Sequence, residues 1–107
     1  MKIIRETFEG DYTADEPTAI YGMVTGSVTV NSRLELNGIV NGDFTVHSAG
    51  DAKVRGIVNG MVINEGGNLE VYGIVNKDVL EIAGKTFIHP DAKIGPPSNQ
   101  MPRGFHR

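Results

Sequence analysis

The chain has 107 residues, of which 39% are hydrophobic, enough for one domain with a modest core. Its formal net charge of −3 argues against nucleic acid as the main partner, because phosphate binding requires a basic surface. Cysteine is absent, which excludes disulfides and thiol catalysis and fits a cytoplasmic location. The apolar run in residues 1–6 is too short for a signal peptide or a membrane span, so we expect neither.

One short phrase recurs along the chain. Its five copies are Phe8–Tyr12, Val24–Val28, Val40–Phe44, Val58–Val62 and Val75–Val79. The central position of the phrase falls at 10, 26, 42, 60 and 77, so the spacings are 16, 16, 18 and 17 residues. A unit this short cannot cover its own apolar face, and neighbouring units must therefore stack into one continuous core. The repeat predicts a solenoid.

Between the glycines, apolar and polar residues alternate, as in Val28-Thr29-Val30 and Leu34-Glu35-Leu36. A period of two is typical of strands, and no window shows helical periodicity. If each turn lies on the previous one, equivalent residues form ladders about 4.8 Å apart. Three ladders are expected: Phe8, Val24, Val40, Val58 and Val75; Tyr12, Val28, Phe44, Val62 and Val79; and Ile20, Leu36, Val54 and Val71. The expected fold is an all-β, single-domain parallel β-helix of about five short turns.

The repeat becomes irregular near its C-terminal end, where Lys77 replaces the glycine of the phrase. We expect residues 1–95 to form the β-helix domain, with residues 77–95 as an irregular turn that caps it, because terminal repeats are commonly atypical. Residues 96–107 carry no periodicity and include three of the five prolines, so we expect a flexible C-terminal tail.

The repeated pattern resembles that of the bactofilin family of bacterial polymer-forming, cytoskeletal proteins. The segments that carry this resemblance are Gly22–Val28, Gly38–Phe44 and Gly56–Val62, and it extends over roughly residues 8–95. The resemblance implies a right-handed coil with a three-sided core. It also implies filaments that form by end-to-end stacking without a nucleotide.

An aliphatic residue precedes the inward valine in four copies of the phrase, at Met23, Ile39, Ile57 and Ile74. If the valines point inward, these residues form an exposed stripe, and an exposed apolar stripe marks a protein-interaction site. The alternative is that the chain turns a corner here, which would leave both residues of each pair partly buried. The pattern does not decide between the two.

The ends of the coil are a second candidate surface. Open ends present unpaired strand edges, which invite the addition of another chain. We expect self-association through Phe8 and Tyr12 at one end and through Phe87, Ile88 and Ile94 at the other. Residues 1–16 carry a net charge of −3 and residues 93–107 a net charge of +3, which favours contact between opposite ends.

No set of residues suggests catalysis. His47, His89 and His106 fall in different units, and nothing in their spacing brings them to one metal ion. No phosphate-binding loop or Ser-His-Asp order is present. We therefore expect no enzyme, no cofactor and no metal.

Two hypotheses remain. The first is a bactofilin-like structural protein that self-associates through the ends of its β-helix. The second is a small protein-binding module, similar to an immunity protein or antitoxin, that uses the aliphatic stripe to mask a partner protein. The partner is thus either a second copy of the chain or a specific protein.

Overall fold

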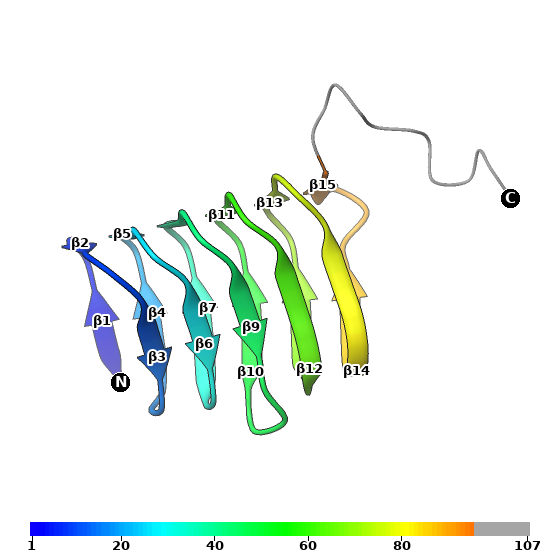
Figure 1. Ribbon diagram of the computed structural model, residues 1–107, viewed down its shortest axis with the longest axis horizontal. Coiled ribbons are helices and arrows are strands. Elements are labelled where there is room, and N and C mark those ends of the chain that lie inside the picture. Colours follow the sequence, from blue (N-terminus) through cyan, green and yellow to red (C-terminus); the bar gives the residue numbers. More distant parts are fainter. Residues whose placement is uncertain (96–107) are drawn as a thin grey trace, which may run out of the picture.

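The computed structural model describes residues 1–95, which form a parallel β-solenoid of about five turns (Figure 1). Within that range no residue is helical, and so no helix there could cross a membrane. The expected all-β, single-domain coil is confirmed. The tail expected at residues 96–107 lies outside the described residues.

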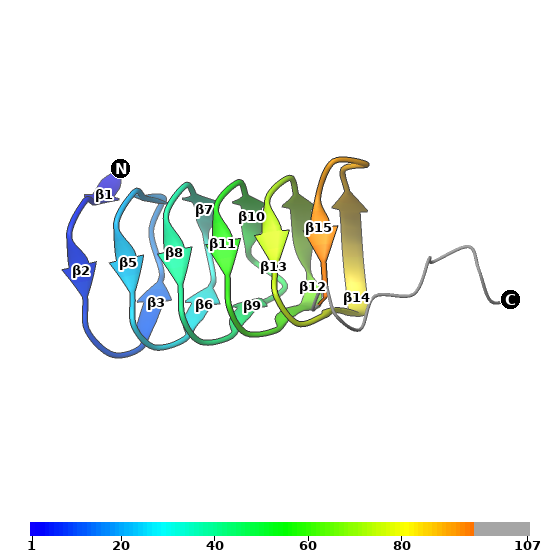
Figure 2. The ribbon, with the colours of Figure 1, turned by 90° about the horizontal axis from the view of Figure 1, so that it is seen from above.

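Each turn of the coil has three sides, which follow one another in the same order along the chain (Figures 1 and 2). Side 1 consists of β1 (Lys2–Ile4), β4 (Thr18–Ile20), β7 (Arg33–Leu36), β10 (Asp51–Val54) and the second halves of β12 (Val62–Val71) and β14 (Val79–Ile88). Side 2 consists of β2 (Thr7–Phe8), β5 (Met23–Val24), β8 (Ile39–Val40), β11 (Ile57–Val58), β13 (Ile74–Val75) and β15 (Lys93–Ile94). Side 3 consists of β3 (Tyr12–Ala14), β6 (Val28–Val30), β9 (Phe44–Val46) and the first halves of β12 and β14.

The core lies inside this three-sided coil and is built from the predicted ladders. Parallel pairing places Val24 beside Val40, Val28 beside Phe44, and Leu36 beside Val54, and all of these side chains are buried. Each strand contributes alternate residues to the core, since successive side chains of a strand point to opposite faces. The alternation read from the sequence therefore identifies the inward residues correctly.

A column of glycines, Gly22, Gly38, Gly56 and Gly73, lies at the corner between sides 1 and 2. A Cβ atom at each of the last three would overlap the carbonyl oxygen of the glycine one turn earlier. These carbonyls accept backbone hydrogen bonds, for example from Ile39 N to Gly22 O at 3.0 Å. Glycine is therefore required here because one backbone packs directly against the next.

The unequal unit lengths have one source within the first five turns. The step from side 2 to side 3 is always four residues, as from Val24 to Val28, and the step from side 1 to side 2 is six, as from Leu34 to Val40. The step from side 3 to side 1 varies: it is six residues from Val28 to Leu34 but eight from Phe44 to Ala52. The extra residues form the loop that protrudes between β9 and β10 in Figure 1.

Asn64 is a buried polar residue in a ladder whose preceding members, Val30 and Val46, are apolar. Its Oδ1 atom accepts hydrogen bonds from Gly66 N at 3.1 Å and Gly67 N at 2.9 Å. Its Nδ2 atom donates to three oxygens: Gly67 O, Lys85 O and Thr86 Oγ1. These bonds hold β12 where it bends from side 3 to side 1 and tie it to the last turn.

The last described turn is less regular than the others. β14 pairs with β12 in parallel, but the register shifts between Asn64 and Asn68, so that Ile82 has no partner on β12. The step from side 1 to side 2 also lengthens to eight residues, from Thr86 to Ile94. This turn therefore continues the coil while departing from the spacing of the earlier turns.

Candidate interaction surfaces

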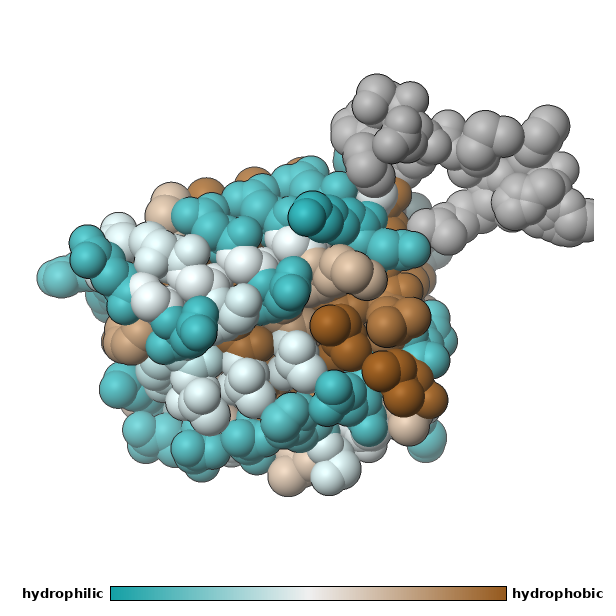
Figure 3. Space-filling view, in the orientation of Figure 1, coloured by the Kyte–Doolittle hydropathy of each residue, from teal (hydrophilic) through white to brown (hydrophobic). Residues whose placement is uncertain are grey.

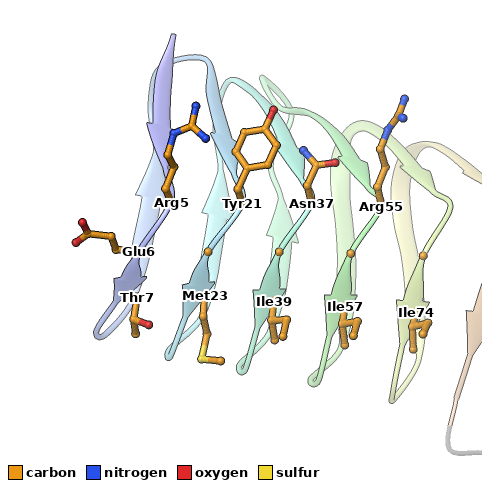
Figure 4. A pocket seen from close by; sticks show the side chains of 14 residues that line it. Arg5, Glu6, Thr7, Tyr21, Met23, Asn37, Ile39, Arg55, Ile57 and Ile74 are labelled. Atoms are coloured by element: carbon orange, nitrogen blue, oxygen red, sulfur yellow. The ribbon is translucent and has the colours of Figure 1, made fainter.

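The aliphatic stripe predicted from the sequence forms one wall of a groove that follows the glycine column (Figure 4). The stripe consists of one residue from each of four successive strands of side 2, paired in register: Met23, Ile39, Ile57 and Ile74. All four are half-buried. Their exposure therefore lies between the two alternatives considered above, an exposed stripe and a corner at which both residues of each pair are partly buried. The groove has a volume of about 710 Å³, and its open face lets these side chains contact a second molecule.

The other wall of the groove is polar and aromatic, and it is formed by Arg5, Tyr21, Asn37 and Arg55 (Figure 4). The Arg5 guanidinium lies 5.5 Å from the centre of the Tyr21 ring, a distance at which the ring face attracts the cation. Arg55 makes the same contact with Tyr72 at 5.6 Å. The wall is therefore preorganised by contacts along the coil axis, between one turn and the next.

Charged residues on side 1 connect to this wall. Arg55 Nε lies 3.8 Å from Glu35 Oε2, and the Tyr72 hydroxyl donates a hydrogen bond of 2.6 Å to Glu70 Oε1. That hydrogen bond, followed by desolvation, raises the pKa of Tyr72 above its usual value of 10.0, because both favour the protonated hydroxyl. Tyr72 thus stays a neutral donor at physiological pH.

At the N-terminal end, the predicted residues Phe8 and Tyr12 lie together. Their rings meet edge to face, with centroids 5.1 Å apart, and the Lys2 ammonium lies 5.6 Å from the centre of the Tyr12 ring. Phe8 is half-buried and Tyr12 is buried, and Ile4 adds a third apolar residue to the end of the core. Among the described strands, β1, β2 and β3 of this first turn pair with the second turn on one edge and with no strand on the other.

At the C-terminal end, two of the three predicted residues continue the core ladders. Ile88 extends the ladder of Val71 and is 37% exposed, and Ile94 extends the ladder of Val75 and is buried. Phe87 instead points outward, because it pairs with the outward residue Glu70. Its ring lies beside the Tyr72 ring, with 6.2 Å between the centroids.

Further apolar residues of β14 were not among the predicted end residues. Leu80 is 46% exposed and Ile82 is 60% exposed, and Val79 is half-buried although its ladder is buried in the preceding turns. Figure 3 shows the hydrophobic surface that gathers at the C-terminal end of side 3. The repeat in the sequence already places Val79 at the C-terminal end of its ladder. The exposure of Ile82 depends instead on a register shift in β14, which the repeat does not predict.

Two histidines of the described chain each lie near one carboxylate. His47 Nε2 lies 3.4 Å from Glu65 Oε1, and His89 Nδ1 lies 3.8 Å from Asp91 Oδ2, in separate exposed pairs. Across residues 1–95, no three histidine or acidic side chains come together as a metal ion would require. His106 lies outside the described residues.

Comparison with known proteins adds no relative. The chain matches no protein-family model, no curated protein and no solved structure. The resemblance to bactofilins therefore rests on the repeated residues themselves, and the function is argued from the surfaces of the coil.

Proposed function

We propose that this chain is a non-enzymatic structural protein that self-associates through the ends of its β-solenoid, as the bactofilin resemblance implies. The observation that carries the proposal is that the core reaches both ends of the coil. Ile4, Phe8 and Tyr12 lie in the first turn and Ile88 and Ile94 in the last described turn, all in ladders that run through the described coil.

Backbone pairing supports the same contact. Among the described strands, those at the edges of sides 1 and 2 are β1 and β2 at one end and β14 and β15 at the other. Edge strands carry backbone N–H and C=O groups that can pair with another chain. A second copy placed head to tail would set its β1 on β14 and its β2 on β15, and would so continue both sheets in parallel.

Charge favours that polarity. Residues 1–16 carry a net charge of −3 and residues 93–107 a net charge of +3, so opposite ends attract and like ends repel. Each exposed ion pair contributes less than about 1 kcal/mol, so charge selects the polarity of the contact while apolar burial supplies most of its free energy.

The first prediction concerns the state of the protein in solution. Sedimentation velocity over a concentration series should show the wild-type chain growing beyond the monomer, and negative-stain microscopy should show linear assemblies. Ile88→Asp removes an apolar side chain from one end and adds like charge, so it should raise the concentration required for association by about tenfold, equivalent to about 1.4 kcal/mol.

Thr45→Asp is the matched control for this prediction. Thr45 is an outward residue of β9, with two strands of side 3 before it and two after it, so this charge should leave association unchanged. Circular dichroism should show the same β signal in all three proteins. A wild-type chain that stays a monomer at millimolar concentration would rule out the proposal.

The groove supports a second candidate function, that of a protein-binding module similar to an immunity protein or antitoxin. The observation that favours it is the continuous groove, in which one aliphatic wall faces one aromatic and cationic wall. Such a mixture of apolar and arginine or tyrosine contacts is typical of binding sites that bury a few anchoring side chains.

The second prediction tests this groove. A partner captured by the wild-type chain should be lost with the double variant Ile39→Asp, Ile57→Asp, since both charges would be placed in the apolar wall. Ile63→Asp is the control, because Ile63 is also a half-buried outward isoleucine but lies on side 3. Retention of the partner by the double variant would exclude the groove as its binding site.

A further inference from the structure

The groove beside the glycine column has two walls of different chemistry, which lie on opposite sides of the glycines in Figure 4. The aliphatic wall is the row Met23, Ile39, Ile57 and Ile74, and the polar wall is the row Arg5, Tyr21, Asn37 and Arg55. Each row takes one residue from each of four successive turns. Because turns are spaced by about 4.8 Å, each row spans about 14 Å along the coil axis.

The floor of the groove has its backbone groups already bonded to neighbouring turns. The Gly38 N–H group donates to Ile20 O, and the Gly38 carbonyl accepts from Ile57 N, both at 2.9 Å. Gly22 and Gly56 are bonded in the same way. A ligand in the groove is therefore recognised by its side chains, and it does not bind by adding a strand to the coil.

The polar wall presents two guanidinium groups with hydrogen-bonding capacity to spare. Arg5 forms no ion pair within the described chain, and it lies over the Tyr21 ring. Arg55 approaches Glu35 only through Nε, at 3.8 Å, in a pair whose side chains are 52% and 38% exposed. Glu6 also lines the groove, but its carboxylate points away from Arg5 in Figure 4. Since a guanidinium can bind a carboxylate through two parallel hydrogen bonds, charge complementarity favours an acidic ligand.

The size of the groove favours an extended segment over a helix. The groove holds about 710 Å³. A helix about 10 Å wide and as long as the groove would fill roughly 1,100 Å³, which is more than the groove contains. An extended chain rises about 3.4 Å per residue, so the first and fifth residues of such a segment are separated by about 14 Å.

An extended segment of five residues also matches the chemistry of the two walls. Alternate side chains point to opposite faces, so positions 1, 3 and 5 would face the polar wall and positions 2 and 4 the aliphatic wall. Positions 1 and 5 are then as far apart as Arg5 and Arg55, which are separated by three turns along the axis. Position 3 lies between them, beside Tyr21 and Asn37.

We propose that the groove binds an extended segment of a partner protein with the order acidic, aliphatic, polar, aliphatic, acidic. The two carboxylates bind the guanidinium groups of Arg5 and Arg55, and the two aliphatic side chains pack on the aliphatic wall and leave water. This inference rests on the second candidate function, the protein-binding module, and specifies the chemistry of its partner. The groove runs along the axis, so a bound segment leaves the ends of the coil open for stacking.

The third prediction compares three short peptides with blocked termini. The peptide Glu-Leu-Ser-Leu-Glu should bind the full chain at least about fivefold more tightly than Leu-Glu-Ser-Glu-Leu, which has the same composition but places its carboxylates at positions 2 and 4. It should exceed Lys-Leu-Ser-Leu-Lys by at least as much, because that peptide sets ammonium groups against the arginines. Saturation-transfer difference NMR measures these affinities whether or not the protein associates, and the leucine methyl groups should receive the strongest saturation.

Variants of the polar wall locate the binding site. Arg5→Gln and Arg55→Gln should each weaken binding of Glu-Leu-Ser-Leu-Glu by about fivefold, as expected for the loss of one exposed ion pair. The double variant Arg5→Glu, Arg55→Glu should bind the lysine peptide in preference. Arg33→Gln is the matched control, since Arg33 is an exposed arginine at the start of β7 and does not line the groove. Circular dichroism should show the same β signal in every variant.

Equal affinity for the two glutamate peptides would overturn the proposal, because the spacing of the carboxylates would not matter. A preference of the wild type for the lysine peptide would also overturn it and would assign a basic partner to the groove. Loss of peptide binding at concentrations where the chain associates would identify a second copy as the occupant, against the proposal. If no peptide bound while Ile39→Asp, Ile57→Asp still released a captured partner, the proposal would fail and the protein-binding module would stand.

Discussion

Replacing Gly38 with alanine should destabilise the protein by about 3 kcal/mol, a large part of the 5–15 kcal/mol that holds a typical domain folded. The added Cβ atom would overlap the Gly22 carbonyl oxygen and lie 2.8 Å from the carbonyl carbon of Tyr21. Both are backbone atoms, so no side-chain rotation relieves the overlap. The two turns would have to separate, which would lengthen the hydrogen bond from Ile39 N to Gly22 O.

Chemical denaturation followed by circular dichroism would measure this effect. Asn37→Ala is the control, because Asn37 precedes Gly38 at the same corner, and its side chain makes one 3.2 Å hydrogen bond, to Glu35. We expect that variant to lose no more than about 0.5 kcal/mol. Equal stability of the Gly38→Ala protein and the wild type would show that the turns are not packed backbone against backbone.

Replacing Asn64 with leucine should cost about 4 kcal/mol. The leucine side chain is similar in size and apolar like the rest of its ladder, but it satisfies none of the backbone groups that Asn64 binds. The N–H groups of Gly66 and Gly67 and the carbonyl of Lys85 would each lose a partner. A buried polar group without a partner costs about 1–3 kcal/mol, so several of them together exceed what the added apolar surface returns.

Asn59→Leu is the matched control for this prediction, since it makes the same chemical change at an exposed position. Asn59 belongs to a ladder of exposed amides, in which it donates to Asn41 Oδ1 at 2.8 Å and accepts from Asn76 at 2.6 Å. Its loss should cost about 1 kcal/mol, because water can replace these bonds. Thermal unfolding of the two variants would separate the cases, and a cost at Asn64 no larger than at Asn59 would contradict the prediction.

The sequence predicts the coil well because two constraints act in every turn. Alternation identifies the inward residues, such as Val28 and Val30, and the repeated glycines identify a corner where the backbones meet. Each turn tests the same pattern again, so a chance match in one unit would not persist through the others. The parallel register of the three predicted ladders follows from that repetition.

The burial of several side chains depends on three-dimensional geometry that the spacing of the repeat does not define. The outward residues Met23, Ile39, Ile57 and Ile74 can be placed in one column from the sequence, but their half-burial depends on the angle of the corner and on the side chains across the groove. Ile82 is exposed because the register of β14 shifts, and Asn64 is buried because its amide closes a bend in β12. Both result from local departures from the repeat, so the repeated pattern does not predict them.

The loop at the corner between sides 3 and 1 can vary in length while the core residues on either side of it keep their positions. Ser48 and Ala49 are exposed in the longest of these loops, while Val46 before them and Ala52 after them remain in their ladders. Residues can therefore be gained or lost at this corner during evolution without moving a buried side chain. The other two corners have no such freedom in the first five turns. A foreign peptide inserted between Ser48 and Ala49 would accordingly be displayed outside a coil whose interior is unaltered.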